Sequence, residues 1–289
     1  MDNVEQAIVR IARSSDLHSI SRIYARSMRE LGKESFEWLR AVLRTRSKRI
    51  VTLVCELNGE VTGFTIAYKK RNAAYIESIA VDESARGKGI GGMLLSELEK
   101  TLAKKGVEKV YLSVKSWNIA ALNFYLGKGY GLKGVVFIMT GDPDYMTTRY
   151  IPGYTVMEIA ASRLKKYRIR PTTWWSNLVE DIDLSIYKKF YKEERAIIVK
   201  KDNRVKAVTT YSVNDELVVD NISLSSYNAI EALEATIMAL RNIAVASGSR
   251  LIEIPVDASK RQLVKLIKEY GFKVRDSEYL LMKDLSTNH

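Results

Sequence analysis

Cysteine and histidine are almost absent from this chain. Cys55 is the only cysteine, and His18 and His289 are the only histidines among 289 residues. A single cysteine permits neither an internal disulfide nor a thiolate metal cluster, and two distant imidazoles argue against a zinc site and against histidine-based nucleophilic catalysis. We therefore expect no metal centre, and an acid or base in this protein must be Glu, Asp, Tyr or Lys.

Long hydrophobic runs are missing as well. No apolar stretch approaches the roughly 18 to 20 residues of a membrane span, and the first residues are too charged for a signal peptide. We expect a cytoplasmic protein with no membrane partner. Hydrophobic residues make up 46% and charged residues 28% of the chain, as in ordinary globular proteins, and the length of 289 residues predicts two domains.

The formal net charge of +12 indicates a preference for anionic ligands. Phosphates of a cofactor, an acidic protein and nucleic acid all fit such a charge, and so does a surface rich in solvated Lys and Arg. The basic residues occur in both halves of the chain, and no basic arm stands out. Nucleic acid thus remains a possible partner that no motif supports.

The order of expected helices and strands occurs twice, which indicates an internal repeat. We place the first copy at residues 1–162 and the second at residues 163–289. In each copy two β-rich runs flank a two-residue turn, Asn58-Gly59 in the first and Asp202-Asn203 in the second, and such turns are typical of β-hairpins.

Two further expectations concern the place where the copies meet. Residues 134–140 and 154–161 are predicted to form the last hairpin of the first copy. The sequence YRIRPTTWW, residues 167–175, is predicted to open the second copy as its first strand and the start of a helix.

A glycine-rich turn follows a predicted strand over residues 73–81 and opens a predicted helix. The turn reads Arg86-Gly-Lys-Gly-Ile-Gly91. Backbone N–H groups at a helix N-terminus have no intrahelical acceptor, and glycines let an anion approach them closely. The spacing matches neither a dinucleotide fingerprint nor a nucleoside-triphosphate loop. The turn therefore predicts a diphosphate site, with a merely flexible connector as the alternative.

Two segments carry a resemblance to a known family. IAVDESARGKGIGGMLL, residues 79–95, and SVKSWNIAALNFYLGKGY, residues 113–130, resemble the core of the GNAT superfamily of N-acetyltransferases. The resemblance implies an α/β (α+β) fold of two tandem GNAT-like domains, each with a mixed, mostly antiparallel sheet whose central pair is parallel and which helices flank. It also implies acetyl-CoA as the acetyl donor.

The second copy departs from the family pattern at its ligand motif. Its turn, residues 223–229, contains no glycine, and Ile267 stands where the first copy has Tyr125. We expect the second copy to bind no diphosphate and to have a structural or acceptor-shaping role.

The resemblance implies a set of donor-binding residues in the first copy. Backbone groups of Ile79, Ala80 and Val81 would pair with the pantetheine arm. Asn118 would bind the pantetheine or the backbone beside it, and its alternative role is to cap the following helix. The diphosphate would be bound by Arg86, Gly87, Lys88, Gly89, Ile90, Gly91 and Gly92.

The reaction requires a base for the amine, an acid for the leaving thiolate and a donor for the oxyanion. Tyr125 is the expected acid, because the family places a tyrosine here and a phenol pKa near 10 suits a thiolate; it could instead be a packing residue. Glu77 is the expected base, through a water, or else a surface residue, since strand alternation leaves its face open. Ser113 replaces a glutamate found in some family members.

Three functions remain open at this level. The first is transfer of acetyl to a primary amine of a polypeptide, at its N-terminus or at a lysine. The second is acetylation of a small-molecule amine. The third is a non-catalytic module that binds acyl-CoA as a signal.

Overall fold

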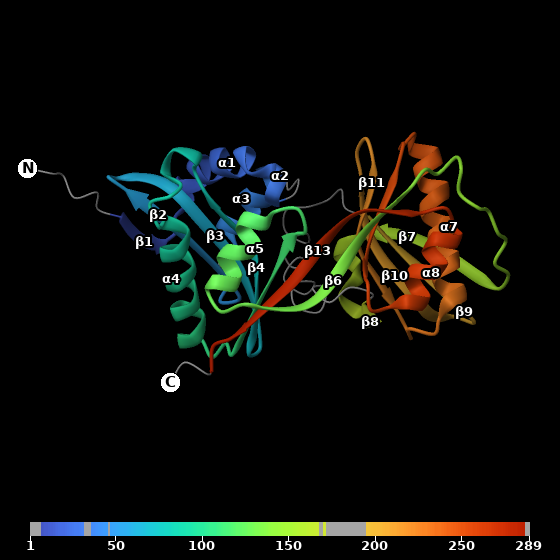
Figure 1. Ribbon diagram of the computed structural model, residues 1–289. Helices are drawn as coiled ribbons and strands as arrows, with labels where there is room; N and C mark the ends of the chain where they lie inside the picture. Colours follow the sequence, from blue (N-terminus) through green and yellow to red (C-terminus); the bar gives the residue numbers. More distant parts are fainter. Residues whose placement is uncertain (1–6, 32–35, 46, 168–169, 172–194, 287–289) are drawn as a thin grey trace, which may run out of the picture. The chain divides into compact units, whose positions relative to one another are not determined.

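The computed structural model describes residues 7–31, 36–45, 47–167, 170–171 and 195–286 (Figure 1). The chain packs into two compact units. Unit one comprises Met1–Val114, Asn118–Leu132 and Leu281–His289, and unit two comprises Lys115–Trp117 and Lys133–Leu280. These packing units do not coincide with the two sequence copies, whose boundary at residue 162 stays a prediction. No helix in the described part of the chain is both long and apolar enough to span a bilayer.

Unit one contains a mixed sheet with the strand order β1-β2-β3-β4-β5-β13. Neighbouring strands are antiparallel from β1 to β4, whereas β4 and β5 are parallel. This arrangement confirms the mostly antiparallel sheet with a parallel central pair. The strands are Ala7–Ile11 (β1), Ile50–Leu57 (β2), Glu60–Lys70 (β3), Ala73–Val81 (β4), Lys109–Lys115 (β5) and Lys273–Asp284 (β13).

Helices α1 and α4 cover opposite faces of this sheet (Figure 1). Phe64 of β3 packs on the α1 side, with its ring 6.3 Å from the ring of Tyr24. A Cβ on the preceding residue, Gly63, would lie 3.0 Å from side chains of α4. The helices are Leu17–Arg26 (α1), Met28–Leu31 (α2), Phe36–Arg44 (α3), Ile90–Lys104 (α4) and Ile119–Gly127 (α5).

The sequence of α4 explains how it packs. Its buried residues recur every three or four positions, which places them on one face of the helix. They are Ile90, Leu94, Leu95, Leu98 and Leu102.

Both predicted hairpin turns are confirmed. Leu57 pairs with Glu60 across Asn58-Gly59, and Lys201 pairs with Arg204 across Asp202-Asn203. All four turn residues have positive φ, from 52° to 83°. A two-residue turn of this kind matches the twist of the strands that it joins, and Asn, Asp and Gly tolerate it best.

Unit two repeats the arrangement, with the strand order β13-β6-β12-β11-β10-β9-β7. Strands β11 and β12 are parallel, and the described pairs β7–β9, β9–β10, β10–β11 and β12–β6 are antiparallel. The strands are Gly131–Gly141 (β6), Tyr154–Ala160 (β7), Arg195–Lys201 (β9), Arg204–Val213 (β10), Leu217–Leu224 (β11) and Ile252–Asp257 (β12).

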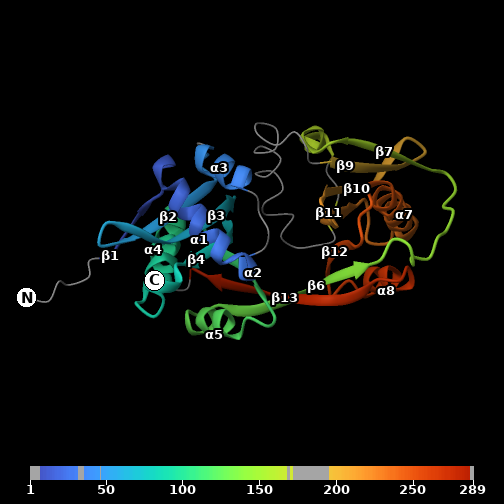
Figure 2. The same cartoon turned by 90° about the horizontal axis from the view of Figure 1, so that it is seen from above.

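Two α-helices lie in the described part of the second unit. They are α7, Ile230–Ser247, and α8, Arg261–Glu269, and both contribute to one apolar core with the strands. Figure 2 shows α7 beside β9 and β10, against which it packs.

The predicted hairpin of residues 134–140 with 154–161 is wrong. Strand β6 pairs with β12, whereas β7 pairs with β9 in the way that β1 pairs with β2. The residues of β7 therefore take the first-strand position that we assigned to residues 167–175. Of that segment the structure describes Tyr167 and a two-residue strand, β8, at Arg170–Pro171, while Trp174 and Trp175 lie outside the described residues.

Candidate active site

Strands β4 and β5 separate part-way along their length. They pair only from Ala73 to Ile76 on β4, whereas β3 pairs with β4 as far as Val81. Beyond Ile76, the edge of β4 that faces β5 has no strand partner among the described residues. An extended ligand chain can add to such an edge through backbone hydrogen bonds. The residues on this free edge include Ile79, Ala80 and Val81, as the expected pantetheine site requires.

Glu77 occupies a β-bulge at the point of separation. Ser78 pairs with Ile66, and Ile76 pairs with Ala67, so that Glu77 is the extra residue on β4. A bulge of this kind turns two successive side chains to the same face of the sheet. Glu77 and Ser78 therefore share a face.

The bulge decides which face Glu77 takes. By the register, this face is the one that carries Tyr75 and Phe64 and that α1 covers. The hydroxyl of Tyr75 lies 3.2 Å from Oγ of Ser113, which joins β4 and β5 on this side. Glu77 is half-buried there, on the opposite face from α4 and its glycine turn.

A short 3₁₀ turn, Glu83–Ala85, orders the chain between β4 and the glycine turn. The buried Asp82 caps it and accepts hydrogen bonds from the Ser84 hydroxyl at 2.9 Å and the Ser84 N–H at 3.2 Å, and these bonds lower its pKa. Arg26 of α1 lies 3.2 Å from the other Asp82 oxygen. Arg86 then donates to the Val81 carbonyl at 3.4 Å. The end of β4 is thus tied to the turn that follows it.

The glycine turn has the conformation that its residues predict. Gly87 and Gly89 have φ of 80° and 77°, in the left-handed region where a Cβ is strained, and Gly89 is the N-cap of α4. The first bond of the helix runs from the Met93 N–H to the Gly89 carbonyl at 3.0 Å. The N–H groups of Ile90, Gly91 and Gly92 come before it, at the positive end of the helix dipole.

Lys128 lies beside this helix N-terminus, which the sequence did not reveal. A Cβ at Gly92 would lie 3.5 Å from Lys128 Nζ, and a Cβ at Gly91 would lie 3.7 Å from the Phe124 ring. Lys128 forms no salt bridge with another described residue. An unpaired cation beside the positive end of a helix favours the binding of an anion there.

Helix α5 carries the other two predicted residues. Asn118 caps it, accepting a hydrogen bond from the Ala121 N–H at 3.1 Å, so the alternative role of Asn118 as a cap is confirmed. Tyr125 is buried, and its ring lies 5.1 Å from that of Phe124 and 5.6 Å from that of Tyr130. Burial raises the pKa of the Tyr125 phenol, which keeps it protonated as an acid must be.

The second copy closes the equivalent slot with its own chain. Strand β12 pairs with β11 only at Leu217 and Val218 and then leaves it. At Ser223 and Leu224 one edge of β11 pairs with β10 and the other with β8. The short strand β8 therefore takes the edge that is free in the first copy.

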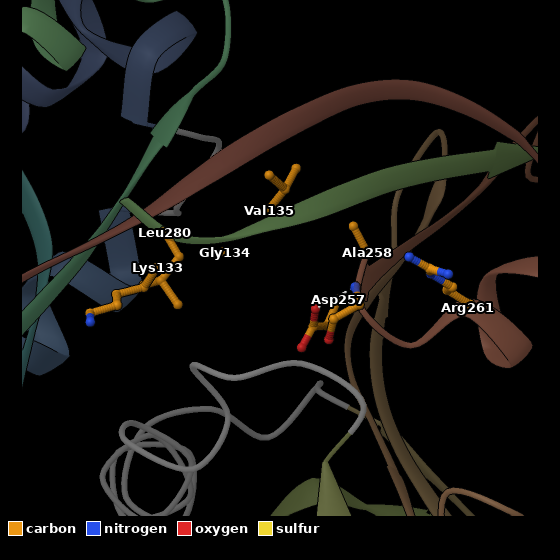
Figure 3. Close-up of a pocket in the computed structure, with 8 residues that line it drawn as sticks. Lys133, Gly134, Val135, Asp257, Ala258, Arg261 and Leu280 are labelled. Carbon is orange, nitrogen blue, oxygen red and sulfur yellow. Dashed lines mark hydrogen bonds between the residues drawn. The ribbon is translucent and has the colours of Figure 1, made fainter. Parts of the chain in front are cut away.

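A shallow cavity in unit two contains none of the predicted site residues (Figure 3). It lies between β6 and the turn that leads into α8, and its charged residues are Lys133, Asp257 and Arg261. All the residues that we expected to bind the donor or to act in catalysis belong to unit one.

Residues 17–131 match the sequence profile of the Acetyltransferase (GNAT) family. The matched residues lie within the first copy and cover less than half of the chain. An uncharacterised N-acetyltransferase of Methanocaldococcus jannaschii is 31% identical over 140 residues, which cover 44% of this chain and 62% of that protein. The [ribosomal protein bS18]-alanine N-acetyltransferase of Escherichia coli is 29% identical over 97 residues, which cover 33% of this chain and 66% of that protein. Each match spans less than two thirds of the relative.

The fold similarity extends over both copies. A solved tandem GNAT protein from the clavulanic acid biosynthesis pathway has a TM-score of 0.74 at 13% identity and covers 98% of this chain and 100% of its own. This similarity confirms two GNAT-like domains in one chain.

Proposed function

We propose that unit one transfers the acetyl group of acetyl-CoA to a primary amine. The observation that carries the proposal is a continuous path on one unit, in which the free edge of β4 leads directly into the glycine turn and the N-terminus of α4. An extended arm can pair along the edge while a diphosphate meets the N–H groups of the turn. These residues fit a nucleotide thioester in both shape and charge.

Glu77 and Tyr125 divide the proton transfers in this proposal. The neutral amine forms a C–N bond with the acetyl carbon, and the bond from that carbon to sulfur breaks. Glu77 takes the proton of the amine through a water, and Tyr125 gives its phenolic proton to the departing sulfur. A backbone N–H near Ile79 or Ala80 stabilises the negative charge on the acetyl oxygen.

We further propose that the acceptor is a polypeptide amine, at an N-terminus or at a lysine. Sequence similarity to an enzyme that acetylates the alanine of a ribosomal protein supports this acceptor class. The hairpin predicted from residues 134–140 and 154–161 could have held a peptide, but it is not formed and gives this acceptor class no support. A small-molecule amine is the alternative acceptor.

The test is a panel of peptides and a panel of small amines incubated with isotopically labelled acetyl-CoA and read by mass spectrometry. We expect label on a peptide amine together with release of free CoA. Label on small amines alone would show that the acceptor is a small-molecule amine and not a polypeptide. Binding of acetyl-CoA without CoA release from either panel would favour the sensing module and contradict the enzyme.

A further inference from the structure

We propose that Glu99, Tyr130 and Lys283 position the catalytic Tyr125, so that the last strand of the second copy completes the active site of the first. This inference rests on the proposed function of unit one. It assigns a role to residues that lie outside both family motifs or at their very end. All four residues belong to unit one.

The contact between Tyr130 and Tyr125 is set by the way α5 ends. Gly129, with φ of 85°, terminates the helix, and the Tyr130 N–H donates to the Tyr125 carbonyl at 3.1 Å. A helix end of this type brings these two side chains into contact. The rings meet edge to face, with centroids 5.6 Å apart and an interplanar angle of 67°. Any rotation of the Tyr130 ring therefore moves the surface on which Tyr125 rests.

Two polar contacts fix the Tyr130 ring. Its hydroxyl donates to Glu99 Oε1 at 3.0 Å, and Lys283 Nζ donates to Glu99 Oε2 at 2.7 Å. The side chains of Glu99 and Lys283 are only 15% and 16% exposed, so water competes little for these bonds. Lys283 Nζ also lies 5.8 Å from the centre of the Tyr130 ring. The hydroxyl and the ring are thus held from two directions.

The second copy offers a partial comparison. Its helix α8 ends in the same way, with φ of 97° at Gly271 and a bond from the Phe272 N–H to the Ile267 carbonyl at 3.4 Å. Phe272 has no hydroxyl, and the strand that lies against it contributes Gly141, where a Cβ would lie 3.0 Å from the ring. Phe272 itself makes no polar side-chain contact, but Tyr270, just before the glycine, donates to Glu234 at 3.0 Å, and Arg149 lies 3.3 Å from the same carboxylate.

The comparison shows which contact to the last ring is particular to the first copy. The ring that follows the terminal glycine packs in both copies, but only in the first copy does this ring carry a hydroxyl that is bound to a glutamate. In the second copy the tyrosine, the glutamate and the cation hold the residue before the glycine. Lys283 comes from β13, whose residues Lys273–Leu280 belong to unit two and whose end belongs to unit one. The polar contacts to β13 therefore place a residue of the second copy behind the acid of the first.

The test is a double-mutant cycle on the full chain with Lys283→Met and Tyr125→Phe. We expect Lys283→Met to lower kcat about 10- to 100-fold, since a small misplacement of a catalytic group has that effect. Its KM for acetyl-CoA and its Kd for CoA should stay within about twofold of the parent values, because the diphosphate turn is untouched. In the Tyr125→Phe background Lys283→Met should have no further effect, and Lys283→Arg should restore most of kcat.

The controls separate the possible failures. Lys104→Met, an exposed lysine at the far end of α4, should change neither kcat nor KM. Equal losses of kcat from Lys283→Met in both backgrounds would overturn the inference, as would an unchanged kcat. If Lys283→Met fails to fold, Glu99→Gln retains the shape and must show the same pattern. Full activity of Tyr125→Phe would instead refute the proposed acid, and the inference with it.

Discussion

At Gly63 the sheet and α4 approach closely, and Gly63→Ala tests whether that approach sets the diphosphate site. An added Cβ would lie 3.0 Å from Ile90 Cγ2, 3.0 Å from Leu94 Cδ1 and 3.2 Å from the Ala80 carbonyl. Carbon atoms prefer separations of about 3.5 to 4.0 Å, so the first turn of α4 must move outward by about 0.5 to 1 Å. This turn carries the N–H groups of the proposed diphosphate site.

The expected cost follows from this overlap. Overpacking a well-packed core costs about 1–3 kcal/mol. The loss of backbone freedom in the unfolded chain returns about 0.4–1 kcal/mol to an alanine variant. The net destabilisation is therefore about 1–2 kcal/mol, which lowers the melting temperature of a protein of this size by about 2 to 8 °C. We expect a loss of CoA affinity of about 1 kcal/mol, or about fivefold, from the same movement.

Thermal unfolding followed by circular dichroism and CoA titration by calorimetry measure the two effects. Gly131→Ala is the matched control, because Gly131 lies in a strand of the same unit and a Cβ there meets no atom within 4 Å. We expect Gly131→Ala to melt at or above the parent temperature and to bind CoA normally. A Gly63→Ala protein that is as stable as Gly131→Ala would refute the reasoning.

Three further predictions concern separate parts of unit one. Because burial raises the pKa of Tyr125, its phenol should stay protonated to above about pH 10. A parent pH–rate profile whose activity falls as the pH rises from about 7 to 9, when that of Tyr125→Phe does not, would contradict its role as the acid. Lys128→Met should raise the Kd for CoA about fivefold without destabilising the free protein, because an unpaired cation beside a helix N-terminus is removed; calorimetry with Lys104→Met as control decides. Asp16 accepts hydrogen bonds of 2.8 and 2.9 Å from Arg10, and these bonds lower the pKa of its carboxyl group. The ionised carboxylate therefore stabilises the fold at pH values above its ordinary pKa of about 3.9, and this contribution is lost as the pH falls through the lowered pKa. Asp16→Asn should therefore lower the free energy of unfolding by about 1–3 kcal/mol at pH 7. In urea titrations its free energy of unfolding should also fall less steeply than that of the parent between about pH 5 and pH 2, and an unchanged pH dependence would contradict this.

The local chemistry of the chain was readable from the sequence. Turns such as Asn58-Gly59 and the glycine turn at 86–91 depend on residues that tolerate positive φ, and the structure has that φ at both turns. Strand and helix on either side of the glycine turn also lie where hydrophobic spacing predicts them. The family motif could also be predicted from the sequence, because its residues are neighbours along the chain.

Contacts between distant residues were not readable in this way. Strand β7 follows β6 after a loop, as a hairpin would, but its pairing partner β9 is set by the repeat and not by proximity in sequence. Lys128 reaches Gly92, and Lys283 reaches Glu99, only because α4, α5 and β13 meet in the fold. The face of Glu77 depended on the position of one bulge. Neither spacing nor composition reports such facts.

The most direct test of the central claim is a crystal structure of the full chain with CoA. We expect the diphosphate at the N–H groups of Gly89 through Gly92 and the pantetheine along Ile79, Ala80 and Val81, with the sulfur within hydrogen-bond distance of the Tyr125 hydroxyl. CoA bound along β11 in unit two, or bound elsewhere with the glycine turn empty, would contradict the account.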